Sequence, residues 1–263
     1  MEIIIKPDYG EICREAAGII QRAWKKKKSL VLGFPTGRTP LGLYEKLIEL
    51  YDNGEMDFSD IVTFNVDEYL GLEETHPQSF ACYMENHLFR HVNIKKENIH
   101  HLSGKPDDIE EHCRAYEMKI RRAGGINIQV LGIGTNGHIA FNEPSSSLSS
   151  RTRLEALAQE SIKANAHFFQ DEKEVPRFCL TMGIGTFLES RMILLLASGR
   201  DKAEAVAGAI EGPITASVPA SALQLHPQAR FVIDEDAASK LIRKDYYRWK
   251  YENRVKASEF LKK

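Results

Sequence analysis

Short apolar runs alternate with amphipathic segments along almost the whole chain, and this alternation limits the fold more than any other feature. Seven runs have the length and apolar content of buried strands: residues 3–5, 30–34, 61–66, 126–133, 178–182, 192–197 and 230–233. Other segments carry apolar residues at helical spacing: residues 11–27, 41–51, 78–91, about 107–122, about 160–169, 184–189 and 203–210. This order predicts a mostly parallel sheet flanked by helices. We expect a single domain over residues 1–263, with a docked polar helical extension from about residue 235.

Composition and charge narrow the classes of function. The formal net charge of −2 gives no electrostatic reason to expect binding to nucleic acid or to an anionic membrane. No apolar run reaches the length that spans a bilayer, and the first residues lack the features of a signal peptide. The four cysteines, at 13, 82, 113 and 179, are scattered and form no CxxC pair. We therefore expect a cytoplasmic protein with reduced thiols.

The stretch from residue 126 to Pro144 holds the densest group of polar side chains at a predicted strand end. Three of them lie within eight residues: Asn136, His138 and Glu143. Ligands in open α/β sheets bind beyond the carboxyl ends of the strands, so this loop is a candidate active site. Its glycines match the dinucleotide fingerprint: Gly132, Gly134 and Gly137. However, Pro144 and the serines after it disfavour the helix which that motif requires, so we expect no nicotinamide cofactor.

Three other strand ends carry weaker signals. The loop 35–40 and the helix after it could hold a phosphate at the helix N-terminus beside Arg38, or form an ordinary turn capped by Thr39. Asp67 could act as a general base, although alone the residues favour a turn cap there and a solvated Glu68. Lys202 opposes the dipole at a helix start, a conflict that a bound anion would relieve, but taken alone this position favours a solvated lysine. His87 and His91 lack a third ligand at a recognisable spacing, so we expect no metal site.

Together, several stretches resemble the glucosamine-6-phosphate deaminase family, which belongs with the glucosamine/galactosamine-6-phosphate isomerases. The motifs occur in the family's order over nearly the whole chain: residues 35–40, 64–69, 132–144, 149–153 and 219–226. The resemblance implies a Rossmann-like α/β sandwich. It also implies conversion of glucosamine 6-phosphate and water to fructose 6-phosphate and ammonia, which we class at this point as hydrolase chemistry on a C–N bond. No cofactor is implied, and self-association is compatible with the family.

The resemblance also assigns roles to residues. Asp67 matches the base that moves a proton between C2 and C1, and His138 matches the base that opens the sugar ring. Glu143 matches the carboxylate that supports His138, and Asn136 stands where members have Asp or Asn. The match also gives a phosphate pocket, formed by Thr36, Gly37, Thr39 and Lys202.

Three positions depart from the family pattern. Arg38 stands where a small residue is usual, and His167 stands where the family usually has an arginine that contacts phosphate. Either Arg38 supplies the missing cation from the opposite wall, or the substrate is a different sugar phosphate. Glu155 replaces a basic residue of the effector site in regulated members, which argues against that regulation here.

Two other functions compete with this one. A 6-phosphogluconolactonase has a similar loop, but that family typically lacks the carboxylate that Glu143 provides. A non-catalytic sugar-phosphate sensor would have no need for Asp67, His138 and Glu143 together. Release of ammonia separates the deaminase from both.

Overall fold

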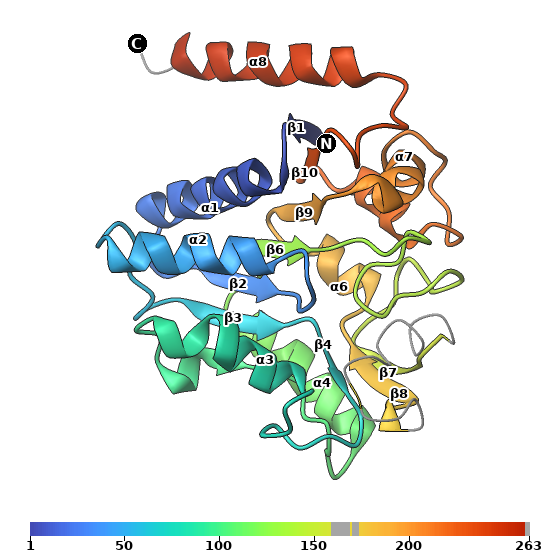
Figure 1. Cartoon of the computed structure of the whole chain (residues 1–263). Coiled ribbons are helices and arrows are strands. Elements are labelled where there is room, and N and C mark those ends of the chain that lie inside the picture. The colour runs from blue at the N-terminus through green and yellow to red at the C-terminus, as the bar shows by residue number, and fades with distance from the viewer. Residues whose placement is uncertain (159–168, 170–173, 261–263) are drawn as a thin grey trace.

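The chain folds around a seven-stranded parallel sheet in this computed structural model, which describes residues 1–158, 169 and 174–260. The strand order is β1-β10-β9-β6-β2-β3-β5, and every neighbouring pair is parallel. The strands are β1 (Glu2–Lys6), β2 (Val31–Phe34), β3 (Val62–Asn65), β5 (Ile99–His100), β6 (Ile128–Leu131), β9 (Ile193–Ala197) and β10 (Ala229–Asp234). The sequence-based prediction of a single-domain, mostly parallel α/β sandwich is therefore confirmed (Figure 1).

Helices cover both faces of this sheet. The α-helices are α1 (Tyr9–Lys26), α2 (Leu41–Asp52), α3 (Phe80–His87), α4 (Ile109–Arg122), α6 (Ile184–Leu188), α7 (Ala203–Ile210) and α8 (Lys244–Phe260). Short 3-10 helices are η1 (Phe89–His91), η2 (Lys96–Asn98), η5 (Arg200–Lys202) and η6 (Pro219–Leu225).

The apolar core is divided into two layers by the sheet. Along β9, Leu194 and Leu196 pack in the layer under α1 and α2, while Leu195 packs in the layer that contains α4, α6 and α7. Successive side chains of a strand point to opposite faces, and both faces here are buried. This explains why the strands read as continuous apolar runs rather than as alternating patterns.

A second, three-stranded antiparallel sheet was not predicted. Its order is β4-β8-β7, formed by β4 (Asp67–Tyr69), β8 (Phe178–Thr181) and β7 (Arg153–Ala156). The chain leaves the main sheet at Val66, whose N–H donates to the Phe34 carbonyl and whose carbonyl accepts from Met182. Residues 67–69 therefore form a strand of their own rather than the solvated turn that their charges suggest.

Several predicted helix ends differ from the observed ones. Pro40, not Thr39, is the N-cap of α2, and no side chain caps that helix, so the capping role of Thr39 is wrong. The helix expected over residues 78–91 is divided into α3 and η1. The expected helical segment at 160–169 falls almost wholly outside the described residues.

Candidate active site

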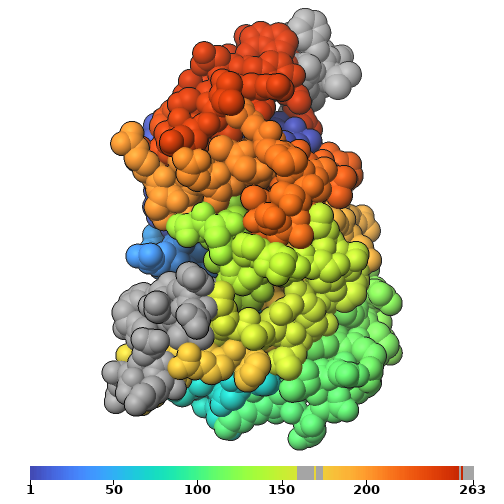
Figure 2. All heavy atoms as spheres, turned by 90° about the vertical axis from the view of Figure 1, so that its right-hand side faces the viewer, coloured from blue at the N-terminus to red at the C-terminus, as the bar shows by residue number. Residues whose placement is uncertain are grey.

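Four neighbouring strands bring the predicted site residues to one edge of the sheet. The strands β9, β6, β2 and β3 are adjacent and parallel, so their carboxyl ends lie together. The loop 35–40 follows β2, Asp67 follows β3, the loop 132–143 follows β6, and Lys202 follows β9. Figure 2 looks at this side of Figure 1 and shows the yellow-green central segment below the orange segment that follows β9. His167 lies outside the described residues.

A hydrogen-bonded chain of three side chains defines the central loop. The Asn136 amide donates from Nδ2 to Glu143 Oε2 at 2.8 Å, which turns its oxygen toward His138. His138 Nδ1 lies 2.7 Å from that oxygen, Asn136 Oδ1, and 3.4 Å from Glu143 Oε2. An amide oxygen only accepts, so Nδ1 carries the proton and Nε2 becomes the basic nitrogen of the neutral ring. The amide thus transmits the orienting effect of Glu143, an arrangement that the sequence does not reveal.

Two glycines make room for this arrangement. A methyl group at Gly134 would lie 2.1–2.5 Å from ring atoms of His138, so any larger residue would push the imidazole away. Gly137 has φ of +85°, a conformation that glycine adopts without strain. No helix opens between Gly137 and Pro144, whereas the dinucleotide-binding motif has a helix at its third glycine.

Asp67 is the most unusual charged residue at this edge. Its side chain is only 6% exposed, and within the described part of the chain its Oδ1 is buried without a hydrogen-bond partner. Burial, followed by the nearby charge of Glu68, raises the pKa of Asp67 well above its ordinary value. A raised pKa favours the protonated form of this carboxyl group more than in water, which suits a group that must both take and return a proton.

Glu68 is buried as well, which contradicts the solvated position expected for it. Its Oε1 accepts from the N–H groups of Tyr69 and Phe80, at 2.8 and 3.0 Å, and Oε2 accepts from Ala81 at 3.0 Å. Burial raises the pKa of Glu68, and these three backbone donors oppose the rise. The two adjacent carboxyl groups therefore differ in role: Glu68 ties β4 to the start of α3, while Asp67 lacks such partners among the described residues.

A contact through the second sheet links Asp67 to the central loop. Asp67 pairs with Thr181 across β4 and β8, and the Thr181 hydroxyl accepts from the N–H of Phe141 at 3.2 Å. The Asn142 side chain donates to the carbonyls of Ile139 and Met182. The loop that carries His138 and Glu143 is therefore fastened to the strand beside Asp67.

Three tyrosines hold the carbonyl groups of the loop 35–40. Tyr44 donates to the Pro35 carbonyl, Tyr83 donates to Gly37 at 2.6 Å, and Tyr9 donates to Thr39 at 2.9 Å; the last two contacts fix the loop from α3 and α1. Gly37 has φ of +102°, and the sequence continues directly into α2. Such a turn at a helix N-terminus suits an anion, with exposed Arg38 beside it and Thr36 and Thr39 half-buried. None of these tyrosines was predicted.

Lys202 stands at the start of α7, on the strand end next to the central loop. Its Nζ lies 3.5 Å from Asp201 Oδ2, and its side chain is 21% exposed. The turn before it is held by Asp234, which accepts from the Ser198 hydroxyl at 2.6 Å and from the Gly199 N–H. The structure thus places a second cation at the same edge as the loop 35–40.

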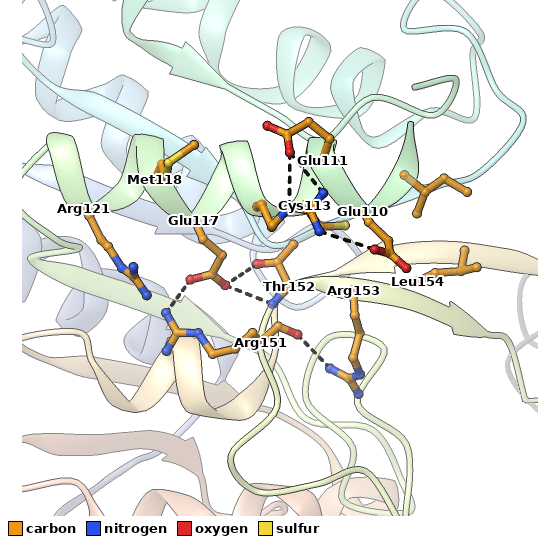
Figure 3. Close-up of a pocket in the computed structure, with 12 residues that line it drawn as sticks. Glu110, Glu111, Cys113, Glu117, Met118, Arg121, Arg151, Thr152, Arg153 and Leu154 are labelled. Atoms are coloured by element: carbon orange, nitrogen blue, oxygen red, sulfur yellow. Dashed lines mark hydrogen bonds and ion pairs between the residues drawn. The ribbon is translucent and has the colours of Figure 1, made fainter. Parts of the chain in front are cut away.

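A separate cavity of about 900 Å³ lies between α4 and β7 (Figure 3). Glu117 on its wall accepts from Arg151 and from both the hydroxyl and N–H of Thr152. The neighbouring Arg153 donates to Asn142 Oδ1 at 2.9 Å, so this wall supports the central loop from behind. None of the predicted catalytic residues lines the cavity, and the candidate active site is therefore the strand edge rather than this cavity.

Two further features concern metals and membranes. Among residues 1–158, 169 and 174–260, no group of three or more His, Cys, Asp or Glu side chains is placed to hold a metal ion. No helix in those ranges is long and apolar enough to cross a bilayer.

Comparison with known proteins gives consistent matches. Residues 9–232 match the family described as "Glucosamine-6-phosphate isomerases/6-phosphogluconolactonase". Glucosamine-6-phosphate deaminase from Thermoanaerobacter pseudethanolicus is 49% identical over 239 residues, which cover 91% of this chain and 94% of the relative. Glucosamine-6-phosphate deaminase 2 from Bacillus subtilis is 49% identical over 243 residues, covering 92% and 98%.

Solved structures agree with these sequence matches. A monomeric glucosamine-6-phosphate deaminase superposes with a TM-score of 0.89 at 43% identity, covering 91% of this chain and all of the other. The 6-phosphogluconolactonase from Leishmania guyanensis superposes with a TM-score of 0.69 at 20% identity, covering 90% and 97%. The second likeness concerns the fold alone.

Proposed function

The chain belongs to the family of glucosamine-6-phosphate isomerases and 6-phosphogluconolactonases, and we propose that it converts glucosamine 6-phosphate to fructose 6-phosphate with release of ammonia. One observation carries this proposal: the chain from Glu143 through Asn136 to His138 lies on the same sheet edge as the buried carboxyl group of Asp67. The names of relatives that are 49% identical support it.

The sequence-based classification as a hydrolase is wrong. The matching family is described by its isomerases, and the reaction is an aldose–ketose isomerisation coupled to loss of the amine. The chemistry therefore depends on moving a proton between two carbon atoms, a step which requires a base that can return the proton it takes.

His138 begins the proposed reaction by opening the sugar ring. The closed sugar must pass a proton from its anomeric hydroxyl to the ring oxygen, and a neutral imidazole suits this transfer because its pKa lies near working pH. Nε2 acts as the acceptor, because Nδ1 donates to Asn136 Oδ1. Glu143 lies 3.4 Å from Nδ1 and stabilises the charged ring while it holds the proton.

Asp67 then moves the proton between carbons. Ionised, it takes the proton from C2 of the open aldehyde and leaves an enolamine; protonated, it returns the proton to C1. Water replaces the amine at C2, so the products are the ketone and ammonia. Its raised pKa makes the protonated form easier to reach, and that form is the one that returns the proton to C1.

The phosphate group anchors the substrate at the other end of the site. We assign it to the turn of Thr36, Gly37 and Thr39, with Arg38 and Lys202 as cations and with His167 as a further proposed contact. Binding energy from a remote phosphate fixes the reacting carbons against the bases. Arg38 is exposed at this turn, as a side chain that closes over an incoming anion would be.

A panel of phosphorylated sugars tests the function. Purified protein should release ammonia from glucosamine 6-phosphate. It should not hydrolyse 6-phosphogluconolactone faster than the spontaneous reaction. Hydrolysis of the lactone without ammonia release would favour the lactonase, and binding of phosphosugars without turnover would favour a sensor. Including the galactosamine epimer shows whether Arg38 alters the choice of sugar.

We also propose that the protein works in the cytoplasm. All four cysteines are free, and Cys13, Cys113 and Cys179 are buried as thiols. Proteins of oxidising compartments more often use cysteines in disulfides.

A further inference from the structure

The outer face of α8 carries an exposed apolar stripe that the proposed reaction does not use. Ile242, just before the helix, is 90% exposed, Tyr246 is 51% exposed and Trp249 is 60% exposed. Tyr246 and Trp249 are three residues apart within α8 and therefore lie on one face of the helix, and Ile242 lies in the turn that leads into it. Tyr246 and Trp249 stack, with ring centroids 6.3 Å apart and planes 22° apart. Large aromatic side chains exposed together in this way are typical of interaction sites.

The opposite face of α8 is already occupied by the body of the protein. The Tyr247 hydroxyl donates to Glu211 Oε1 at 3.1 Å, and Lys6 lies over the Tyr251 ring at 5.7 Å. Arg254 pairs with Glu2 at 3.2 Å. The helix α8 is therefore held against β1 (Figure 1). The family match ends at residue 232, before α8 begins. These contacts fix the position of α8 and leave its outer face exposed.

The sequence around the stripe follows the heptad pattern of a parallel two-stranded coiled coil. Within α8, Trp249 takes a d position and Tyr246 and Asn253 take a positions, while Ile242 lies in the turn just before the helix. The g positions of α8 are acidic, with Asp245 and Glu252, and its e position is basic, with Lys250; Arg243, also basic, lies just before the helix. All four charged residues are exposed.

This distribution of charge favours a second α8 helix in parallel orientation as the partner. In a parallel pair a g residue faces the e residue five positions later on the other helix, whereas in an antiparallel pair g faces g and e faces e. Asp245 would therefore meet Lys250 of a second helix in the parallel arrangement. The antiparallel arrangement would bring like charges together. A single polar residue at an a position, here Asn253, favours two helices in one register.

We propose that α8 is a self-association site, at which two copies of this chain pair their α8 helices in parallel through Ile242, Tyr246, Trp249 and Asn253. The helical part of the contact is about two turns long, so the area it buries falls short of the roughly 1,200 Å² typical of stable interfaces. Association in the micromolar range is therefore expected. The pairing does not depend on the proposed enzymatic function, because α8 contributes no residue to the candidate active site.

Sedimentation velocity on the full chain tests this proposal. The 29.8 kDa chain should shift toward a dimer as its concentration rises from about 1 to 300 µM. Each single variant, Asp245→Lys or Lys250→Asp, should raise the dimer dissociation constant about tenfold, because it places like charges at two symmetric contacts. The double variant should restore the wild-type constant to within about threefold.

Control variants make the result specific. Glu97→Lys is an exposed charge reversal at η2, beside the far edge strand β5, and should leave the dimer unchanged. Trp249→Asp should remain monomeric while keeping the wild-type circular-dichroism spectrum and melting temperature, which shows that it is folded. Wild-type protein that stays monomeric over the whole concentration range would overturn the proposal. This holds also if α8 of that monomer binds lipid vesicles. So would a double variant that fails to recover.

Cross-linking tests the parallel register directly. Equivalent a positions face each other only in a parallel pair, so Asn253→Cys should form a disulfide with its own copy when copper–phenanthroline is the oxidant. Wild-type protein gives the background from its four native cysteines. Cross-linking no greater than that background would contradict the parallel pairing.

Discussion

Replacing Asp67 by asparagine should abolish turnover and, at neutral pH, stabilise the fold. The change keeps the shape of the side chain but removes both its charge and its ability to take a proton. Loss of a general base typically lowers the rate about 10²–10⁴-fold, and substrate binding should persist because the phosphate turn is untouched. The gain in stability follows from the environment of the carboxyl group, which is buried and has an unpaired Oδ1 among the described residues.

The size and pH dependence of this gain can be worked out. A neutral buried polar group without a partner costs about 1–3 kcal/mol and a charged one costs more, so asparagine keeps the first cost and removes only the excess due to the charge. For a chain of this size each kcal/mol corresponds to about 2–4 °C in melting temperature. The folded-state pKa of Asp67 is raised, so the wild type has its full stability below the unfolded-state pKa and loses part of it as pH rises toward the folded-state value. The advantage of the variant should therefore be small near pH 4 and grow toward pH 8.

Calorimetry and an ammonia-release assay on the same samples measure both effects. Glu68→Gln is the matched control, because Glu68 accepts three backbone N–H groups and its amide would turn an N–H toward one of them. That variant should lose about 1–3 kcal/mol, opposite in sign to the gain at Asp67. An Asp67→Asn protein that retains turnover, or that is less stable than the wild type at pH 8, would refute this reasoning.

Three further changes probe the rest of the site. Arg38→Gly should raise KM for the sugar phosphate about tenfold or more with little effect on kcat, whereas an unchanged KM would remove Arg38 from phosphate binding. Lys202→Met should also raise KM, and combining it with the first change should raise it further; a loss confined to kcat would contradict this role. His138→Asn should lower the rate with the closed sugar about 10²–10⁴-fold, and a substrate supplied in the open form should be affected much less.

The sequence alone was sufficient for the layout of the site. Parallel strands place their carboxyl ends on one edge, so the loops after residues 34, 66, 131 and 197 had to converge once the alternation of strands and helices was recognised. The role of Gly134 could not be predicted, because the glycine motif does not show that the imidazole of His138 packs against this position.

The burial of Asp67 and Glu68 could not be predicted from composition. Two adjacent carboxylates predict a solvated turn. They are buried because their strand, β4, pairs antiparallel with β8, and this pairing is not apparent from the local sequence. The place of Asn136 between Glu143 and His138 depends likewise on the turn geometry, not on spacing. The tyrosines that hold the loop 35–40 come from α1, α2 and α3, so no local pattern connects them with it.

In the proposed reaction, one buried carboxyl group carries a proton from C2 to C1 while ammonia leaves. Glucosamine 6-phosphate labelled with deuterium at C2 tests it most directly, with the product analysed by mass spectrometry and the ammonia measured in parallel. We expect one ammonia for each fructose 6-phosphate, with part of the deuterium found at C1, because Asp67 is shielded from water. Wild-type product whose C1 contains none of the label, together with an Asp67→Asn variant that releases ammonia at the wild-type rate, would contradict it.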